Sequence, residues 1–416
     1  MTSDRPNLRI DADRLWTSLM ELAQIGATEK GGVCRIALTD LDRQGRDLVA
    51  AWLREAGCSV EIDGVGNIFA VRPGTDSTAP VVFAGSHIDT QPSGGKFDGN
   101  YGVLAGLEVL RTLNDARVAT SRPVGVAIWT NEEGSRFVPV MGGSGAFAGV
   151  FNPEHLRAQR DVDGVSFGDA LAQIGYAGET PVGVRTLDAY FEAHIEEGPI
   201  LEREGKVIGV VTGALGQRWY DCVLTGQDAH AGPTPMETRR DALLGAAKVI
   251  EAVRALALRH GPDGRGTVGF VQVRPNSRNV VPGRVALSVD LRHPDDRALA
   301  TMDAQLKDAA ASIARDLRLE CDLRQVDQFP SSRFDAKCIA LVRDAATALD
   351  LPWREMPSGA GHDAIYVARV APASMIFVPC KDGISHNETE DARPEHLEAG
   401  ANVLLHAMLA RAGVAR

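Results

Sequence analysis

The chain has 416 residues, more than a single hydrophobic core usually serves, so its length predicts two domains. Its formal net charge of −11 disfavours nucleic acid and anionic membrane surfaces as partners. No apolar run reaches the roughly 18 residues that a membrane span needs, and the polar N-terminal segment lacks the pattern of a signal peptide.

The first half alternates helices with continuous apolar strands. We expect a helix near Asp47–Glu55, a strand at Pro80–Gly85, a helix from Tyr101 onward, and strands at Val124–Trp129 and Tyr190–Ile195. Continuous apolar strands separated by helices are typical of a sheet that is covered on both faces. This part of the chain therefore predicts an α/β layer.

From about Gly213 the pattern changes to a smaller α+β arrangement. The expected elements are a strand at 218–225, a helix at Asp241–Leu256, strands at Thr267–Val273 and Arg284–Arg292, a helix near Ala300–Ala314 and a strand near Leu319–Val326. Residues 284–292 alternate between apolar and polar side chains, which indicates a half-exposed strand. The order β-α-β-β-α-β is that of a ferredoxin-like domain.

After Pro330 the first pattern returns, with a strand at Met375–Val378 and a helix after Pro394. We therefore predict a discontinuous α/β domain, residues 1–212 and 331–416, with a mixed sheet flanked by helices. A ferredoxin-like α+β domain, residues 213–330, is inserted into it.

The cysteines are scattered and form no CxxC pair: Cys34, Cys58, Cys222, Cys321, Cys338 and Cys380. In a chain of this length such scatter predicts reduced thiols and a cytoplasmic protein, rather than a disulfide framework or a thiolate zinc site.

Five segments concentrate His, Asp and Glu where apolar strands end or helices begin: 85–90 (GSHIDT), 96–102 (KFDGNYG), 131–134 (NEEG), 194–198 (HIEEG) and 385–388 (SHNE). In open α/β sheets, functional sites form at the carboxyl ends of the strands. Imidazoles and carboxylates without clustered thiolates suit zinc, manganese, cobalt or nickel.

Each segment alone has an ordinary structural explanation. An HxD pair is usually a hydrogen-bonded turn, two adjacent glutamates usually form a solvated face, and Asp98 before a glycine is typical of a turn or a helix N-cap. The combination of all five segments predicts a metal site. Sequence alone leaves open which of Glu132 and Glu133 would bind metal.

Several longer motifs keep a common order along the chain: GSHIDT, GKFDGNYGVLAGLE, NEEGSRF, EAHIEEGP, DAHAGPTPMETRRDAL, NVVPGRVALSVDLRHPD, SGAGHDA and GISHNE. Together they closely resemble the amidase, hydantoinase/carbamoylase family, part of the M20 metallopeptidase superfamily, from about residue 10 to the C-terminus. The resemblance implies a di-metal catalytic domain and a smaller domain that serves as a dimerisation or lid domain.

The resemblance also implies roles for individual residues in the larger domain. It implies two divalent metal ions per subunit (Zn, Mn, Co or Ni), with His87 and His194 on one, Glu133 and His386 on the other, and Asp98 bridging both. Asp89 resembles the carboxylate that orients the His87 imidazole, and Glu132 resembles the general base.

In the smaller domain, His230 resembles a residue that reaches the partner subunit's metal centre in a homodimer and stabilises the anionic intermediate. The resemblance implies that Asn279 and Arg292 also act in trans in this homodimer. Residues that resemble contacts to a small substrate are Asn279, Arg292, Glu197, Gln217, Gly359 and Gly361. One position departs from the family, because Glu197 stands where many carbamoylases carry glutamine. A carboxylate there accepts hydrogen bonds from a terminal –NH₂ group and repels an anionic one.

The implied reaction is hydrolysis of the carbamoyl C–N bond of N-carbamoyl-L-amino acids or N-carbamoyl-β-alanine. A water that bridges the metals would attack, with Glu132 as the base, to give amino acid, CO₂ and ammonia. An allantoate amidohydrolase or another ureido hydrolase is the next alternative, followed by a dipeptidase or aminoacylase. A catalytically silent binding protein would be expected to lack some ligands or the base, and this chain keeps them.

Overall fold

The continuous apolar strands predicted in the first half form the centre of a large mixed sheet in the computed structural model, which describes residues 8–415. The described chain divides into two compact units. Unit 2 is Gly213–Ser332, and unit 1 comprises the described residues before and after it.

Unit 1 contains the large sheet. Its strands are β1 Ser59–Ile62, β2 Ile68–Arg72, β3 Val81–His87, β4 Val124–Trp129, β5 Leu187–Ile195, β6 Ile208–Ala214, β14 Ser332–Arg333, β15 Trp353–Ser358 and β16 Ala373–Val378. Its α-helices are α1 Ala12–Leu22, α2 Asp40–Glu55, α3 Asn100–Asp115, α4 Gly142–Phe147, α5 Pro153–Ala158, α6 Phe167–Gln173, α7 Ile200–Glu204, α10 Ala336–Ala348, α11 Asp363–Val367 and α12 Pro394–Ala412, with a 3-10 turn η2 at Lys381–Gly383.

The sheet order is β1-β2-β4-β3-β5-β16-β6-β14, and β15 pairs with β6. Strands β4, β3, β5 and β16 run parallel to one another, whereas β2 and β6 pair antiparallel on either side of them. The four central strands therefore end at the same edge of the sheet.

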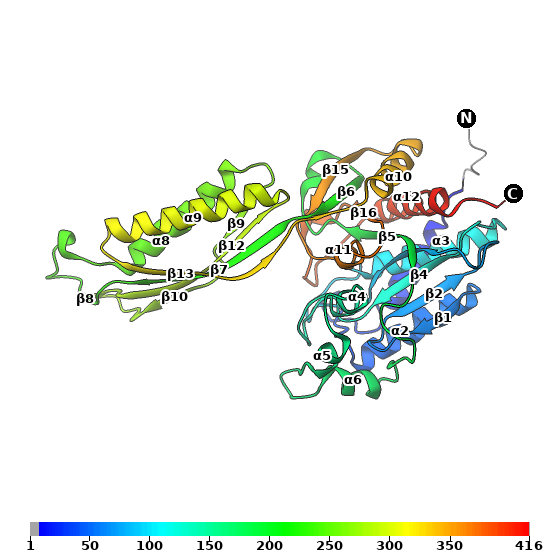
Figure 1. The fold of residues 1–416 in the computed structure, drawn as a ribbon, viewed down its shortest axis with the longest axis horizontal. Helices are drawn as coiled ribbons and strands as arrows, with labels where there is room; N and C mark the ends of the chain where they lie inside the picture. The colour runs from blue at the N-terminus through cyan, green and yellow to red at the C-terminus, as the bar shows by residue number, and fades with distance from the viewer. Residues whose placement is uncertain (1–7, 416) are drawn as a thin grey trace. The chain divides into compact units, whose positions relative to one another are not determined.

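Both faces of the sheet are covered (Figure 1). Along β3, Val82 and Ala84 belong to a core shared with α1, α2, α3, α10 and α12, whereas Val81 and Phe83 belong to a second core with α11. Successive side chains thus reach opposite cores, which explains why these strands are apolar without alternation. The predicted α/β class with a mixed sheet is confirmed.

Unit 2 has an antiparallel sheet with two long helices on one face (Figure 1). Its elements are β7 Gly216–Thr225, β8 Ala229–His230, η1 Met236–Thr238, α8 Ala242–Arg259, β9 Arg265–Thr267, β10 Val271–Arg274, β11 Val280–Val281, β12 Arg284–His293, α9 Asp296–Asp316 and β13 Glu320–Phe329. The strand order β10-β12-β7-β13 is ferredoxin-like. Apolar residues of β12 pack toward the helices, and the polar face of the strand is left open.

Two expected elements differ from the structure. The helix expected near Asp47–Glu55 begins at Asp40, because the Thr39 side chain accepts a hydrogen bond from the Asp42 amide and caps a polar first turn. The strand expected at Thr267–Val273 is two strands, β9 and β10, which pair with different ends of β12. Gly269 lies in the gap between them, where it interrupts the ladder.

Among the described residues, none of the helices combines the length and the apolar composition that crossing a membrane requires.

Candidate metal centre

The predicted ligand segments follow the carboxyl ends of the four parallel strands of unit 1. His87 is the last residue of β3, and His194 is the penultimate residue of β5. Glu132 and Glu133 follow β4, and His386 lies in the segment after β16. The parallel register therefore brings residues that are far apart in sequence to one edge of the sheet.

The first group of donors consists of His87, His194 and Asp98. The Nε2 atom of His87 lies 3.6 Å from Asp98 Oδ1, and the Nε2 atom of His194 lies 3.3 Å from the same oxygen. All three residues are buried, with exposed fractions of 5% or less. Their potential ligand atoms lie within 4.8 Å of one another, which suits a single cation.

The second group consists of Asp98, Glu133 and His386. The Nε2 atom of His386 lies 3.5 Å from Asp98 Oδ2 and 3.3 Å from Glu133 Oε2. Asp98 thus turns one oxygen toward each group. This arrangement matches the bridging carboxylate that the resemblance implies.

The two buried imidazoles are held through their other ring nitrogen. Nδ1 of His87 is 2.9 Å from the backbone carbonyl of Asp89, and Nδ1 of His194 is 3.0 Å from the carbonyl of Ile195. Each carbonyl accepts a hydrogen bond from Nδ1–H, so in the neutral ring Nε2 is the nitrogen that can bind a cation. The Gly99 amide also lies 3.1 Å from His194 Nε2.

Asp89 lies beside both the His87 ring and the turn of the two glutamates. Its carboxylate lies 4.0 Å from His87 Nδ1, and it accepts hydrogen bonds from the backbone N–H groups of Glu132 and Glu133. The backbone carbonyl of Asp89 orients the imidazole, because it lies closer to the ring nitrogen. The carboxylate fixes the turn that carries the two glutamates.

The two adjacent glutamates point in different directions. Glu133 accepts two hydrogen bonds from Gln91 and faces His386. Glu132 faces the first group, with its Oε2 atom 3.7 Å from His87 Nε2. The geometry therefore places Glu133 among the donors of the second group and leaves Glu132 beside the first.

The charges in this site affect one another strongly. Burial alone would raise the pKa of the Asp98 carboxyl, but hydrogen bonds from His194 and His87 hold that pKa well below its usual range. Burial raises the pKa of Glu132 well above its ordinary value. A carboxyl with a raised pKa beside a reacting group suits proton transfer.

Three of the ten described non-glycine residues with a positive φ lie in the site segments. Asn131, Glu197 and His386 have positive φ values of 56°, 56° and 52°, although none is glycine. Gly99 has a φ of 65°, and a Cβ atom there would overlap the His87 ring. Strained residues of this kind persist where the surrounding structure fixes them, as at functional sites.

The donor set fits a pair of divalent cations. It consists of imidazole nitrogens and carboxylate oxygens, divided into two groups that share Asp98. Such donors suit first-row transition metals. A third group, Glu192 with His194 and His362, reuses His194, and Glu192 already accepts hydrogen bonds from Ser86 and the Ala364 amide.

Two residues at the edge of the second group complete this region. Glu197 lies 3.6 Å from His386 Nε2 through one oxygen and 3.7 Å from His362 Nε2 through the other. His362 is buried, and its ring lies 4.6 Å from that of His194. It lies in the SGAGHDA motif, where a single histidine carries no spacing signal that would predict a site residue. Gly359 and Gly361, in the same motif, are exposed.

In unit 2, His230 and Asn279 are neighbours. The short strands β8 and β11 pair His230 with Val280, and the Ala231 amide donates to the Asn279 carbonyl. Both His230 and Asn279 are exposed.

Arg292 and Gln217 form a second pair in unit 2, directly opposite each other on β12 and β7. Asp290 accepts hydrogen bonds from the Arg292 guanidinium on the open face of the sheet. At the other end of the same ladder, Arg284 pairs with Thr225, next to the segments that carry His230 and Asn279. Eight residue steps along β12 separate the two ends, or about 26 Å.

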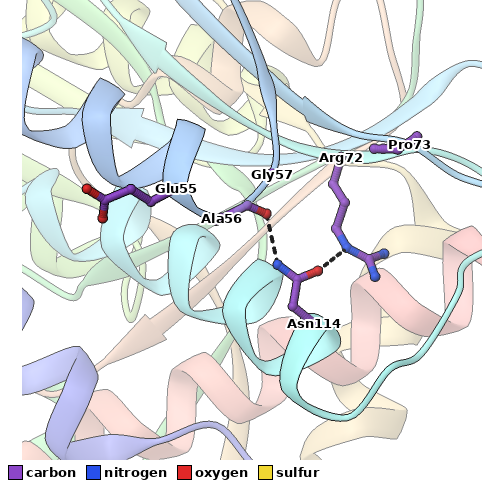
Figure 2. Close-up of a pocket in the computed structure, with 6 residues that line it drawn as sticks. All are labelled: Glu55, Ala56, Gly57, Arg72, Pro73 and Asn114. Carbon is purple, nitrogen blue, oxygen red and sulfur yellow. Dashed lines mark hydrogen bonds between the residues drawn. The ribbon is translucent and has the colours of Figure 1, made fainter.

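A surface cavity lies elsewhere in unit 1, between the end of α2, strand β2 and the end of α3 (Figure 2). Asn114 accepts a hydrogen bond from Arg72 and donates one to the Ala56 carbonyl. These bonds join the three elements, and the cavity contains none of the predicted site residues.

Comparison with known proteins gives consistent matches over nearly the whole chain. Residues 83–410 match the family described as Peptidase family M20/M25/M40. An N-carbamoyl-L-amino-acid amidohydrolase of Rhizobium meliloti is 49% identical over 414 residues and covers 100% of both chains. An allantoate amidohydrolase of Bacillus subtilis is 34% identical and covers 92% of this chain and 93% of its own.

A solved structure agrees with this result. A crystal structure of an amidase of the hydantoinase/carbamoylase family from Burkholderia multivorans is 60% identical, with a TM-score of 0.96. The alignment covers 98% of this chain and 99% of that one.

Proposed function

The chain belongs to the peptidase family M20/M25/M40 and is a hydrolase of amide C–N bonds, and from this premise we propose that it hydrolyses N-carbamoyl-L-amino acids or N-carbamoyl-β-alanine. One water is consumed, and the products are the amino acid, CO₂ and ammonia. The observation that carries the proposal is the convergence of five donors from five separate segments into two groups that share Asp98. The 49% identical amidohydrolase supports the carbamoyl substrate.

We propose that His87, His194 and Asp98 hold one divalent cation and that Asp98, Glu133 and His386 hold a second. When bound, the cations would acidify water and polarise the substrate carbonyl. Glu132 is the general base, because it faces the first group and takes no part in either. It accepts the proton of the attacking water and returns it to the leaving nitrogen.

The residues of unit 2 supply binding and charge stabilisation. His230 donates a hydrogen bond to the oxyanion of the tetrahedral intermediate, and Asn279 lies beside it. The Arg292 guanidinium binds the free carboxylate of the substrate, next to Gln217. The Gly359–Gly361 segment of unit 1 provides exposed backbone groups for the same end of the substrate.

We infer that the pair His230 and Asn279 and the pair Arg292 and Gln217 act on one substrate from different copies of the chain. About 26 Å separates the two ends of β12, more than a carbamoyl amino acid and two side chains span. One substrate therefore cannot contact both pairs of a single unit 2. In a homodimer, His230 and Asn279 of one copy would complete a site that uses Arg292 and Gln217 of the other.

A surface of unit 2 suits such a dimer. The outer face of α8 exposes four large apolar side chains, Leu243, Leu244, Ile250 and Leu258, each at least 39% exposed. In the same unit, β10 is an edge strand; Val271, its first residue, and Phe270, which precedes it, are exposed. Uncovered apolar faces and open strand edges are typical of surfaces that pair with a second copy.

All six cysteines are free thiols, which supports a cytoplasmic location.

An allantoate amidohydrolase is the second candidate, supported by the 34% identical Bacillus subtilis relative. The two candidates are distinguished by a substrate panel of N-carbamoyl-L-amino acids, N-carbamoyl-β-alanine, allantoate, and N-formyl and N-acetyl amino acids, with Mn²⁺, Co²⁺ or Zn²⁺ added. We expect the highest kcat/KM for an N-carbamoyl compound. A higher value for allantoate, or for the N-acetyl compounds, would contradict the proposal.

The role of Glu132 is tested with Glu132→Gln, which keeps the shape of the side chain and removes the base. We expect kcat to fall by about 10²- to 10⁴-fold while metal content stays at the wild-type level. Wild-type turnover by this variant would exclude Glu132 as the base.

A further inference from the structure

Glu390 is a buried carboxylate that takes no part in the proposed chemistry and contacts the backbone of Asp98. Glu390 is 3% exposed, and its Oε1 atom accepts hydrogen bonds from the backbone N–H groups of Phe97, at 2.9 Å, and Asp98, at 3.2 Å. Glu390 lies almost 300 residues away along the chain, in the segment that also carries His386. One side chain therefore fixes the backbone at the shared residue of both donor groups.

Glu390 also reaches the Asp98 side chain through Ser385. The Ser385 hydroxyl lies 3.0 Å from Glu390 Oε2 and 3.0 Å from Asp98 Oδ2. Asp98 Oδ2 is the oxygen that faces His386, and Ser385 directly precedes His386. A single chain of contacts thus joins the Asp98 carboxylate, the His386 segment and the Asp98 backbone.

The packing around Glu390 leaves little room for another arrangement. A Cβ atom at Gly95 would overlap the Glu390 carboxyl group, and a Cβ atom at Gly32 would come within 2.7 Å of the Glu388 backbone. The segment that contains residues 385–390 therefore packs closely against the loop before Asp98 and against Gly32.

We propose that Glu390 is a positioning residue that sets the orientation of Asp98, so that one carboxylate oxygen faces each of the two donor groups. This inference rests on the proposed two-cation site and goes beyond it, because Glu390 touches neither a cation nor the substrate. Ser385 carries the effect to Asp98 Oδ2, so the second group, with Glu133 and His386, depends on it most. Groups that orient a ligand typically change metal affinity by about 10- to 100-fold when they are removed.

Two substitutions separate positioning from a merely structural role. Glu390→Ala removes the acceptor of both backbone N–H groups. Glu390→Gln keeps a carbonyl oxygen for them, and its amide donates to the Ser385 hydroxyl, which then donates to Asp98. Glu108→Ala is the matched control, because Glu108 is an equally buried carboxylate of unit 1 that binds Arg14 and contacts no donor group.

The probe is Mn²⁺, titrated into full-length protein freed of metal with a chelator, with free Mn²⁺ measured by electron paramagnetic resonance. For Glu390→Ala, we expect Mn²⁺ affinity at the second donor group to fall by about 10- to 100-fold, which raises one of the two dissociation constants. Glu390→Gln should stay within about threefold of the wild type. Glu108→Ala should lower the melting temperature without changing Mn²⁺ affinity.

Wild-type Mn²⁺ affinity in folded Glu390→Ala would overturn the inference, as would a loss in Glu390→Gln as large as that in Glu390→Ala. If Glu390→Ala does not fold, Ser385→Ala decides, because it removes only the link to Asp98 Oδ2. A loss of about tenfold in one of the two Mn²⁺ affinities is expected, and unchanged affinity would overturn the inference. Wild-type protein that binds no Mn²⁺ would instead refute the two-cation site itself.

Discussion

In unit 1, the candidate metal donors lie at the ends of neighbouring parallel strands, and His87 and His194 are almost completely buried. In unit 2, His230 and Asn279 are exposed, and Arg292 lies on an open sheet face. Burial and a backbone carbonyl fix the rings of His87 and His194 before any ligand arrives. Exposure leaves the second set available to another surface.

The difference between the units suggests a division of labour. Charged and polar side chains are costly to bury, so a buried cluster of them indicates a function that repays the cost. Exposed side chains in unit 2 have no such cost, so their exposure alone does not indicate a function. Their positions relative to one another, as in His230 with Asn279 and Arg292 with Gln217, are what point to one. We therefore propose that unit 1 carries out the chemistry and that unit 2 of a second copy completes the site.

The strongest test of this division is complementation between two inactive variants. His230→Ala should lower kcat by about 10²- to 10³-fold, because it removes a donor to the oxyanion. Arg292→Ala should lower kcat/KM by about 10- to 100-fold, through the lost hydrogen bonds to the substrate carboxylate. If the two residues act from different copies, subunits of the two variants, mixed by unfolding and refolding, should recover about a quarter of wild-type activity, since half of the dimers would hold one intact site.

The control is each variant refolded alone, which should stay inactive. A mixture as inactive as its components would mean that both residues act from the same copy, which the length of β12 argues against.

A smaller effect is expected from a charge on the outer face of α8. Ile250→Asp should raise the dissociation constant of the dimer by about 10- to 100-fold, because dimerisation would bury an unpaired carboxylate. Light scattering coupled to gel filtration measures the oligomeric state, and activity should fall with dilution. Ala311→Asp, which places the same charge on an exposed position of α9, is the control and should leave the dimer intact. A dimer unaffected by Ile250→Asp would show that the outer face of α8 is not part of the interface.

The smallest effect concerns Glu197, which lies beside the second donor group in unit 1. Its carboxylate accepts a hydrogen bond from the terminal –NH₂ of a carbamoyl group more strongly than a glutamine does. Glu197→Gln should therefore lower the ratio of kcat/KM for N-carbamoyl over N-formyl substrates by about 3- to 10-fold. An unchanged ratio would exclude contact between Glu197 and the carbamoyl end.

Much of the fold could be predicted from the sequence, because hydrophobic patterns record burial. The strand Val124–Trp129 was predicted with its observed bounds, since both its faces are covered and every residue is apolar. The gap between β9 and β10 was missed. Both strands pair with β12, and the local pattern does not reveal that each pairs with a different end of it. The start of α2 was missed, because its first turns are polar.

The donor segments could be identified because each one interrupts an apolar pattern at the end of a strand. Three features of the site could not be found in this way. The Asp89 carboxylate accepts hydrogen bonds from the backbone at Glu132 and Glu133, which the HxD spacing does not reveal. The positions of His362 and Glu390 depend on contacts between segments that are distant in the chain, and neither residue carries a local signal.

The central claim is that Asp98 joins two donor groups into one site for a pair of cations. Elemental analysis of protein purified without chelator and reconstituted with Mn²⁺ or Zn²⁺ tests it most directly, with Asp98→Ala as the comparison. The account predicts two equivalents of metal per wild-type chain and at most one in the variant, because both groups lose a shared ligand. A wild-type chain that takes up no metal, or an Asp98→Ala chain that retains two equivalents, would contradict it.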